Sequence, residues 1–157
     1  MIRKLGLIIF LSLVFYSPSV NSTGDEDKIF LNLRSKTVCS GRLDKCFPVA
    51  IGKPSHPTPT NVGPYYITDI RLNGFDWQNP FTGRIYKAGT HNLGNIWITF
   101  HQDTVTGNVY GFHKTPEPGK ALSAQQSHGC VRMNYTGIKT FGNSVKFWDQ
   151  VYINKDA

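Results

Sequence analysis

Cysteine and histidine are the residue types in this chain best suited to covalent chemistry. The 157 residues include three Cys and five His. Cys130 stands in a Ser-His-Gly-Cys sequence, and 13 residues separate His113 from the Ser127 that begins it. A thiol with an ordinary pKa is only a few per cent thiolate at neutral pH, so a nucleophilic Cys needs a base within hydrogen-bond reach. Cys130, with His113 as its base, is therefore the leading candidate for a catalytic nucleophile.

The two other cysteines, Cys39 and Cys46, enclose a short polar stretch. In an exported protein such a pair tends to oxidise, and a leftover thiol is reactive or partnered elsewhere. A bridge would close an eight-residue loop and stabilise the chain by roughly 2–3 kcal/mol in the chain-entropy model. We therefore predict a Cys39–Cys46 disulfide, which leaves Cys130 as the odd thiol.

The residues around Cys130 fit acyl chemistry but also allow other interpretations. Gly129 permits a tight backbone turn, and the N–H groups of Gly129 and Cys130 could stabilise the oxyanion of a tetrahedral intermediate. A lone Cys is often only a small buried hydrophobe. His113, His128 and Cys130 could instead ligate zinc, although structural zinc sites usually take four ligands with Cys-x-x-Cys spacing. We expect no metal.

The N-terminus has the pattern of a signal peptide. Arg3 and Lys4 precede a mostly apolar run over residues 5–16, and small residues around Ser22 offer a cleavage site. A membrane-spanning helix needs roughly 20 apolar residues, so this run is too short. We expect residues 1–22 to be removed, giving a mature form at 23–157 with no membrane span, located in the periplasm or cell envelope.

Composition favours one globular domain. The chain is 39% hydrophobic and 17% charged, which excludes a disordered tail protein. Without Arg3 and Lys4, its 17 basic residues fall to 15 against 10 acidic ones, a net charge of about +5. That charge suits an anionic cell envelope and is equally compatible with general solubility. No Lys/Arg-rich run indicates nucleic-acid binding.

Apolar residues alternate with polar ones in several segments, the pattern of half-buried strands. One stretch near the C-terminus has helical spacing instead, at Ile138, Phe141 and Val145. We predict a mostly β domain with loops at 52–63, 73–94 and 115–120. The expected strands are 28–33, 47–51 (an edge strand because of Pro48), 65–72, 96–104, 109–113 and 151–153.

Residues 127–133 (SHGCVRM), preceded by 111–113 (GFH), resemble the signature of the L,D-transpeptidase catalytic domain, the YkuD-like family. That signature has a His, a gap of about a dozen residues, then Ser/Thr-His/Lys-Gly-Cys. Residues 57–60 (PTPT) with Gly63 resemble the family's Thr-Pro-Thr-Gly stretch more weakly. The resemblance covers about 28–153 and implies a mostly β, sandwich-like domain with one or two short helices and no cofactor.

The chain departs from the family pattern in two places. Lys114 follows His113 where the family often has Gly, and two residues separate Thr60 from Gly63. The group that orients the base in this family is usually a main-chain carbonyl, so Lys114 is compatible with the mechanism. Substrate contacts near the base are the feature that this departure puts in question.

The resemblance also implies a role for each residue. Cys130 would attack the carbonyl of the third residue of a tetrapeptide stem and release terminal D-Ala. His113 would take the thiol proton and later help to deprotonate the attacking amine. His128 would shape the pocket, Arg132 would engage a stem carboxylate, and Ser127 would support the nucleophile loop through hydrogen bonds.

The expected activity is formation of 3→3 cross-links between peptidoglycan stem peptides, with the protein as a monomer. Three alternatives remain open at this point. With water as acceptor the protein would be an L,D-carboxypeptidase, and a different pocket would make it another Cys–His peptidase of the cell wall. A non-catalytic wall-binding module on the same fold is the third.

Overall fold

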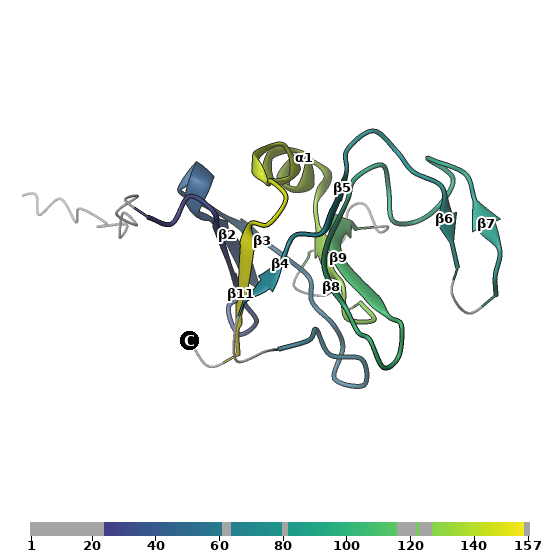
Figure 1. Ribbon diagram of the computed structural model, residues 1–157, viewed down its shortest axis with the longest axis horizontal. Coiled ribbons are helices and arrows are strands. Elements are labelled where there is room, and N and C mark those ends of the chain that lie inside the picture. Colours follow the sequence, from purple (N-terminus) through teal and green to yellow (C-terminus); the bar gives the residue numbers. More distant parts are fainter. Residues whose placement is uncertain (1–23, 61–63, 80–81, 116–121, 123–126, 156–157) are drawn as a thin grey trace, which may run out of the picture.

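Two β-sheets enclose a hydrophobic core in the computed structural model of the chain, which describes residues 24–60, 64–79, 82–115, 122 and 127–155 (Figure 1). The mostly β, sandwich-like expectation is confirmed. Residues 1–22 and nearly all of the loop expected at 115–120 lie outside the described residues. Within the described part, no helix has the length and apolar content needed to cross a membrane.

The first sheet, sheet A, has the strand order β3-β2-β1-β11-β4. Its strands are β1 (Lys28–Asn32), β2 (Thr37–Ser40), β3 (Lys45–Pro48), β4 (Tyr65–Tyr66) and β11 (Gln150–Asn154). The short 3-10 helix η1 (Gly41–Leu43) joins β2 to β3. Cys39 and Cys46 lie opposite one another on these two strands, and the predicted disulfide between them is present.

The second sheet, sheet B, has the order β10-β9-β8-β5. Its strands are β5 (Asp69–Arg71), β8 (Trp97–Gln102), β9 (Val109–Lys114) and β10 (Val131–Met133). β9 pairs with β10 in parallel and with β8 in antiparallel orientation. A small hairpin of β6 (Trp77–Gln78) and β7 (Ile85–Tyr86) projects from the body beside this sheet (Figure 1).

Two predicted strands were wrong in extent. The strand expected at 65–72 divides into β4 in sheet A and β5 in sheet B, because the chain crosses between the sheets at Ile67 and Thr68. There the Ile67 amide bonds to Asp149 and the Thr68 amide to Thr99. Two polar residues, Thr68 and Asp69, shift the apolar alternation by one position there, a shift that a bulge within a single strand would also produce.

The strand expected at 47–51 ends at Pro48, which lies on edge strand β3 as its type predicted. The chain then leaves sheet A, and the Ala50 amide and carbonyl pair with Arg132 at 2.8 Å each. Strands β2, β6, β7 and β10 were not predicted, and β6 and β7 lie in the segment 73–94 that was expected to be a loop. All four are short, and each is defined by its partner strand rather than by a long local pattern.

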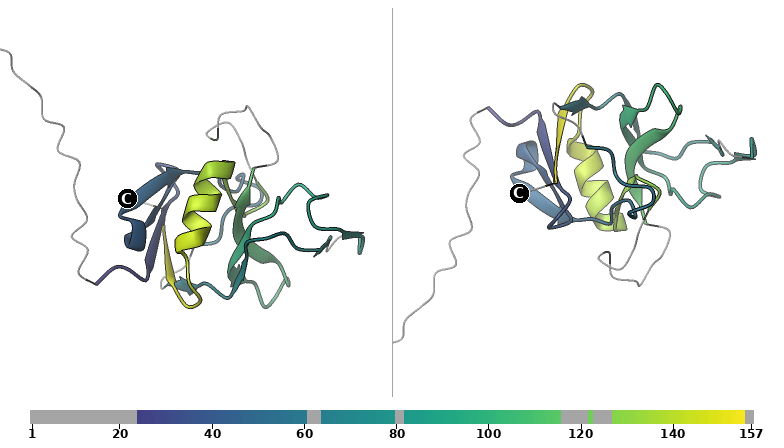
Figure 2. Two further views of the ribbon diagram at one scale, coloured as in Figure 1. Left: turned by 90° about the horizontal axis from the view of Figure 1, so that it is seen from above. Right: turned by 90° about the horizontal axis from the view of Figure 1, so that it is seen from below.

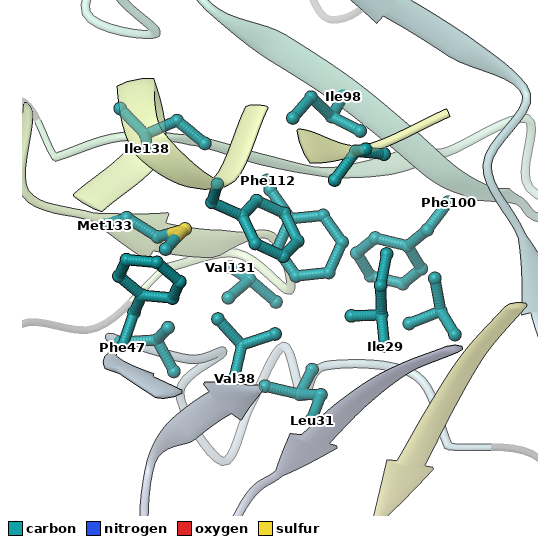
Figure 3. Close-up of a cluster of buried hydrophobic side chains, with 14 of the residues drawn as sticks. Ile29, Leu31, Val38, Phe47, Ile98, Phe100, Phe112, Val131, Met133 and Ile138 are labelled. Carbon is teal, nitrogen blue, oxygen red and sulfur yellow. The ribbon is translucent and has the colours of Figure 1, made fainter. Parts of the chain in front are cut away.

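Helix α1 (Tyr135–Ser144) lies between the two sheets (Figure 2). Asn134 caps its first turn by accepting a hydrogen bond from the Gly137 amide at 2.6 Å. Ile138 and Phe141 are fully buried, as their spacing predicted, whereas Val145 lies just beyond the helix. Figure 3 shows the apolar side chains of both sheets meeting Ile138 in one core, which fixes sheet B against the rest of the molecule.

Candidate active site

Sheet B presents one face to the core and the other to a cleft. Phe112, Ile98 and Val131 on the core face are fully buried. Successive strand residues point to opposite faces, so His113 and Arg132 belong to the other face. That face lines a cleft of about 1290 Å³. The strands thus hold the candidate catalytic side chains on a surface that packing against the core keeps rigid.

Strand register arranges the cleft-facing residues in two rows across the sheet. The first row follows the order β10, β9, β8, β5 and consists of Arg132, His113, Trp97 and Arg71. The second row lies two residues away along each strand. It consists of Cys130 (directly before β10), Gly111, Thr99 and Asp69. Cys130, directly before β10, and His113 on β9 are therefore diagonal neighbours across this parallel pair.

The Cys130 thiol lies against strand β9. It is unbridged and partly exposed, and its Sγ donates to the Val109 carbonyl at 3.9 Å. Burial of the sulfur raises the pKa of Cys130, and hydrogen bonding with the Gly111 main chain and the charge of Arg132 oppose this only in part. At neutral pH the resting group is therefore the thiol.

His113 is buried, and its ring is held from two directions. Its Nδ1 lies 2.8 Å from the Lys114 carbonyl, which can only accept, so Nδ1 carries the proton and Nε2 keeps its lone pair. The Trp97 indole stacks on the ring at 5.6 Å between centroids, and Trp97 Nε1 donates to Thr99 Oγ1. Burial, followed by the charge of Arg132, lowers the pKa of His113 to about 3. The ring is thus a neutral base at physiological pH.

Ser127 makes hydrogen bonds within the loop that carries Cys130. Its Oγ accepts from the Gly129 amide at 3.0 Å and donates to the Cys130 carbonyl. Its own main chain pairs with Ile51 and Lys53. The Gly129 amide, expected as an oxyanion donor, is therefore already engaged by Ser127, which leaves the Cys130 amide as the other predicted donor.

Gly129 is required by its surroundings as well as by its backbone. Its φ is +109°, a backbone conformation that residues other than glycine rarely adopt. A Cβ at this position would lie 2.4 Å from the Tyr110 ring and 3.2 Å from the Pro57 carbonyl. The loop that carries Pro57 (residues 52–60, the proline-threonine loop) is held by Thr58, whose Oγ1 accepts a hydrogen bond from the Gly52 amide at 2.8 Å.

His128 and His56 form one wall of the cleft. Their rings meet edge to face with 4.8 Å between centroids, and both line the cleft. The pKa of His128 is lowered, first by burial and then by the charge of Lys53. Among the described residues, no three His, Cys, Asp or Glu side chains gather as a metal site would require, so His128 does not join His113 and Cys130 in such a cluster.

Residues 26–153 match the family model described as the L,D-transpeptidase catalytic domain, YkuD. The chain belongs to the L,D-transpeptidase family. The match covers both sheets, the helix and the Cys130 loop. Among curated proteins, no sequence match is found.

Solved L,D-transpeptidases share the fold at low sequence identity. The enzyme from Stackebrandtia nassauensis is 17% identical, with a TM-score of 0.57 over 82% of this chain and 55% of that one. L,D-transpeptidase 1 of Mycobacterium tuberculosis is 19% identical, with a TM-score of 0.53 over 83% and 60%. The catalytic domain from E. faecium is 22% identical, with a TM-score of 0.55 over 83% and 98%. The present chain therefore spans little more than half the length of the larger L,D-transpeptidases.

The sequence did not point to several residues that line the L,D-transpeptidase cleft. Phe75 and Asp76, at the base of the β6–β7 hairpin, form part of its wall. Tyr110 lines the cleft beside Gly129, and Asp69 and Arg71 line it from β5. The signal available for the last two was their spacing, because residues two apart in a strand share a face.

Proposed function

We propose that this protein is an L,D-transpeptidase that cleaves the terminal D-Ala from a peptidoglycan tetrapeptide stem and transfers the acyl group to an amine, forming 3→3 cross-links. The observation that supports this most is the position of Cys130, directly before β10, beside His113 on the adjacent strand β9, with both residues lining one cleft. A buried neutral imidazole beside a thiol has the arrangement that nucleophilic acyl transfer needs.

Acylation begins from a neutral pair. His113 Nε2 takes the proton from Sγ as the sulfur attacks the carbonyl carbon, so the imidazolium forms only during the reaction. The amide of Cys130 stabilises the oxyanion. When the C–N bond breaks, His113 returns the proton to the departing amine of D-Ala, leaving a thioester on Cys130.

Deacylation runs in the opposite sense. An amine on a neighbouring stem attacks the thioester carbonyl and gives a proton to His113. The C–S bond then breaks, and the proton passes to the departing sulfur. Because the resting thiol is bonded to the Val109 carbonyl, we infer that Sγ rotates away from that carbonyl toward His113, further along β9, when the stem enters.

Three further residues support this chemistry in the proposal. Arg132 lies beside His113 in the same row, faces the cleft and binds a stem carboxylate. His128 shapes the pocket together with His56. Ser127 holds the nucleophile loop through its bonds on both sides of Cys130.

We also propose that the protein is exported, with residues 1–22 as its signal peptide. The Cys39–Cys46 disulfide supports a location outside the reducing cytosol. The family's action on the cell wall agrees with a periplasmic or envelope location.

Incubation of the protein with disaccharide-tetrapeptide and mass analysis of the products tests the reaction. We expect cross-linked dimers and free D-Ala from the wild type, and neither from Cys130→Ala. Tripeptide without dimers would identify the carboxypeptidase alternative. No turnover by a wild type that still binds sacculi would identify a wall-binding module.

A further inference from the structure

Asp69 and Arg71 form an ion pair on β5, at the opposite edge of sheet B from Cys130. Arg71 Nε donates to Asp69 Oδ2 at 2.6 Å. The guanidinium also lies over the Phe75 ring, 5.6 Å from its centroid. Both side chains remain accessible, with 48% and 35% of their surface exposed for Arg71 and Asp69. Both line the same cleft as Cys130 and His113.

This pair contributes little to holding the fold, because exposed ion pairs are weak in water. Its geometry is nevertheless defined. The Nε contact and the Phe75 ring restrict the position of the guanidinium, and among the described residues Arg71 makes no further hydrogen bond. The two terminal nitrogens of Arg71 therefore remain for a carboxylate, which a guanidinium binds with two parallel bonds. The adjacent Asp69 can accept from an ammonium group.

A carboxylate beside an ammonium is the zwitterion of a free α-amino acid centre. The two register rows end at Asp69 and Arg71, three strands from Cys130 and Arg132. At about 4.8 Å per strand the backbones are about 14 Å apart, and Arg71, Asp69 and Cys130 all line the cleft that spans this separation. In a diamino diacid the far zwitterion lies about 8 Å from the carbonyl at the other end, which leaves about 6 Å to be covered by the Arg71 and Cys130 side chains.

We propose that Asp69 and Arg71 bind the free zwitterionic end of a diamino diacid at the third position of the donor stem. The assignment rests on the proposed function, since it presumes that Cys130 attacks the carbonyl of that residue. Arg71 binds the side-chain carboxylate and Asp69 binds the side-chain ammonium. The enzyme therefore prefers a carboxylated diamino acid, such as diaminopimelate, over lysine.

Three tetrapeptides that differ only at this end test the assignment. The first carries diaminopimelate at position three, the second its side-chain carboxamide, and the third lysine. D-Ala release is measured for each with the wild type, Arg71→Gln, Arg71→Lys and Asp69→Asn. Asp25→Asn is the matched control, because Asp25 and Lys28 form an ion pair of the same 2.6 Å length beside sheet A.

We expect the wild type to favour the carboxylate over the carboxamide and lysine by at least tenfold in kcat/KM, the usual scale of one charge-assisted pair. Arg71→Gln reduces this preference to within threefold and leaves the rates on the two other peptides within threefold of wild type. Arg71→Lys keeps the charge but cannot form two parallel hydrogen bonds to a carboxylate. Its preference for the carboxylated peptide is therefore intermediate between those of the wild type and Arg71→Gln. Asp69→Asn slows all three peptides tenfold, because each carries the ammonium. Asp25→Asn matches the wild type.

A wild type that does not discriminate, or a preference that survives Arg71→Gln, overturns the assignment and leaves the pair as charge that protects an edge strand. Failure of the proposed function has a different signature. In that case a carbapenem leaves no adduct on Cys130, whereas failure of this inference alone leaves the adduct intact.

Discussion

The environments of Cys130 and His113 oppose ionisation of both groups. Burial raises the pKa of the thiol and lowers the pKa of the imidazole to about 3. A thiolate–imidazolium pair, found where a cysteine is strongly activated at rest, is therefore disfavoured here. A neutral thiol reacts more slowly with oxidants than a thiolate does, and in the proposed mechanism the thiol is deprotonated only when it attacks the substrate.

The ionisation of Cys130 can be measured by alkylation. The rate of iodoacetamide modification should be low at pH 7 and rise through and above pH 9, because the thiol pKa is raised from its ordinary value. Cys130 is the only cysteine outside the disulfide, so intact mass follows it directly. A rate that reaches a plateau below pH 7 would show that the resting pair is ionised.

His113 should also make stability depend on pH. Between the folded pKa of about 3 and the unfolded value of about 6.5, the unfolded state binds a proton that the folded state does not. The free energy of unfolding is therefore unaffected above about pH 6.5 and falls as the pH drops toward 3. From pH 7.5 to 5, wild type should lose about 2 kcal/mol more than His113→Gln in urea titrations. Equal losses would mean that His113 charges freely in the folded protein.

At the scale of elements, the Cys130 loop is fixed by packing against two neighbours that the motif does not reveal. Tyr110 from β9 and Pro57 from the 52–60 segment both lie where a side chain at Gly129 would have to fit. The loop therefore takes its shape from β9 and the 52–60 segment together with Ser127.

Gly129→Ala should destabilise the protein by about 1–3 kcal/mol and slow acylation by more than tenfold. The substitution combines backbone strain at φ +109° with a Cβ 2.4 Å from the Tyr110 ring. Gly83→Ala is the control, since Gly83 has φ +69° and nothing within 4 Å of its added Cβ. Denaturant titration and carbapenem adduct formation measure the two effects. Similar acylation by both variants would mean that the contact with Tyr110 does not shape the loop.

Strands with long alternation could be predicted from the sequence, and those defined by distant partners could not. β8 and β9 are six residues each; Ile98 and Phe100, with Ile96 directly before the strand, alternate with their neighbours in the first, and the turn at 106–108 marks the return of the chain into the second. β10 has three residues, and its parallel partner β9 is remote in sequence, so no local pattern marks it. The division of 65–72 between two sheets depends on hydrogen bonds to Asp149 and Thr99, which no local sequence encodes.

At the scale of the whole molecule, the β6–β7 hairpin and its flanking loops form an arm attached to the sandwich. Hydrogen bonding between the Gly74 amide and the Asn95 carbonyl at 2.8 Å closes its base. None of the described residues of this arm (75–79 and 82–94) belongs to the central core cluster. Phe75, Asp76 and Trp77 nevertheless line the cleft. The arm therefore contributes to the wall of the cleft and adds little to the central hydrophobic core.

Replacing residues 75–94 with two glycines should leave a folded protein whose free energy of unfolding falls by about 2 kcal/mol, chiefly through loss of buried Phe75. D-Ala release from a tetrapeptide should fall at least tenfold in kcat/KM, because one wall of the cleft is lost. Iodoacetamide modification of Cys130 should stay within threefold of wild type, since that reagent needs no wall. Unchanged peptide turnover would show that the arm makes no contact with substrate.

The candidate nucleophile and base could be named from the sequence because short motifs mark them. The other contributors to the cleft could not, since their relation to Cys130 is one of register across four strands. Asp69 and Arg71 are about 60 residues away from Cys130 along the chain. Only the pairing of β5 with β8, and of β8 with β9, places Asp69 in the same row as Cys130 and Arg71 in the same row as His113.

The most direct test of the Cys130–His113 mechanism is the intact mass of the protein after incubation with a carbapenem. Wild type should gain one adduct, His113→Gln should gain it far more slowly, and Cys130→Ala should gain none. An unmodified wild type, or an adduct that persists in Cys130→Ala, would contradict acyl transfer through this thiol.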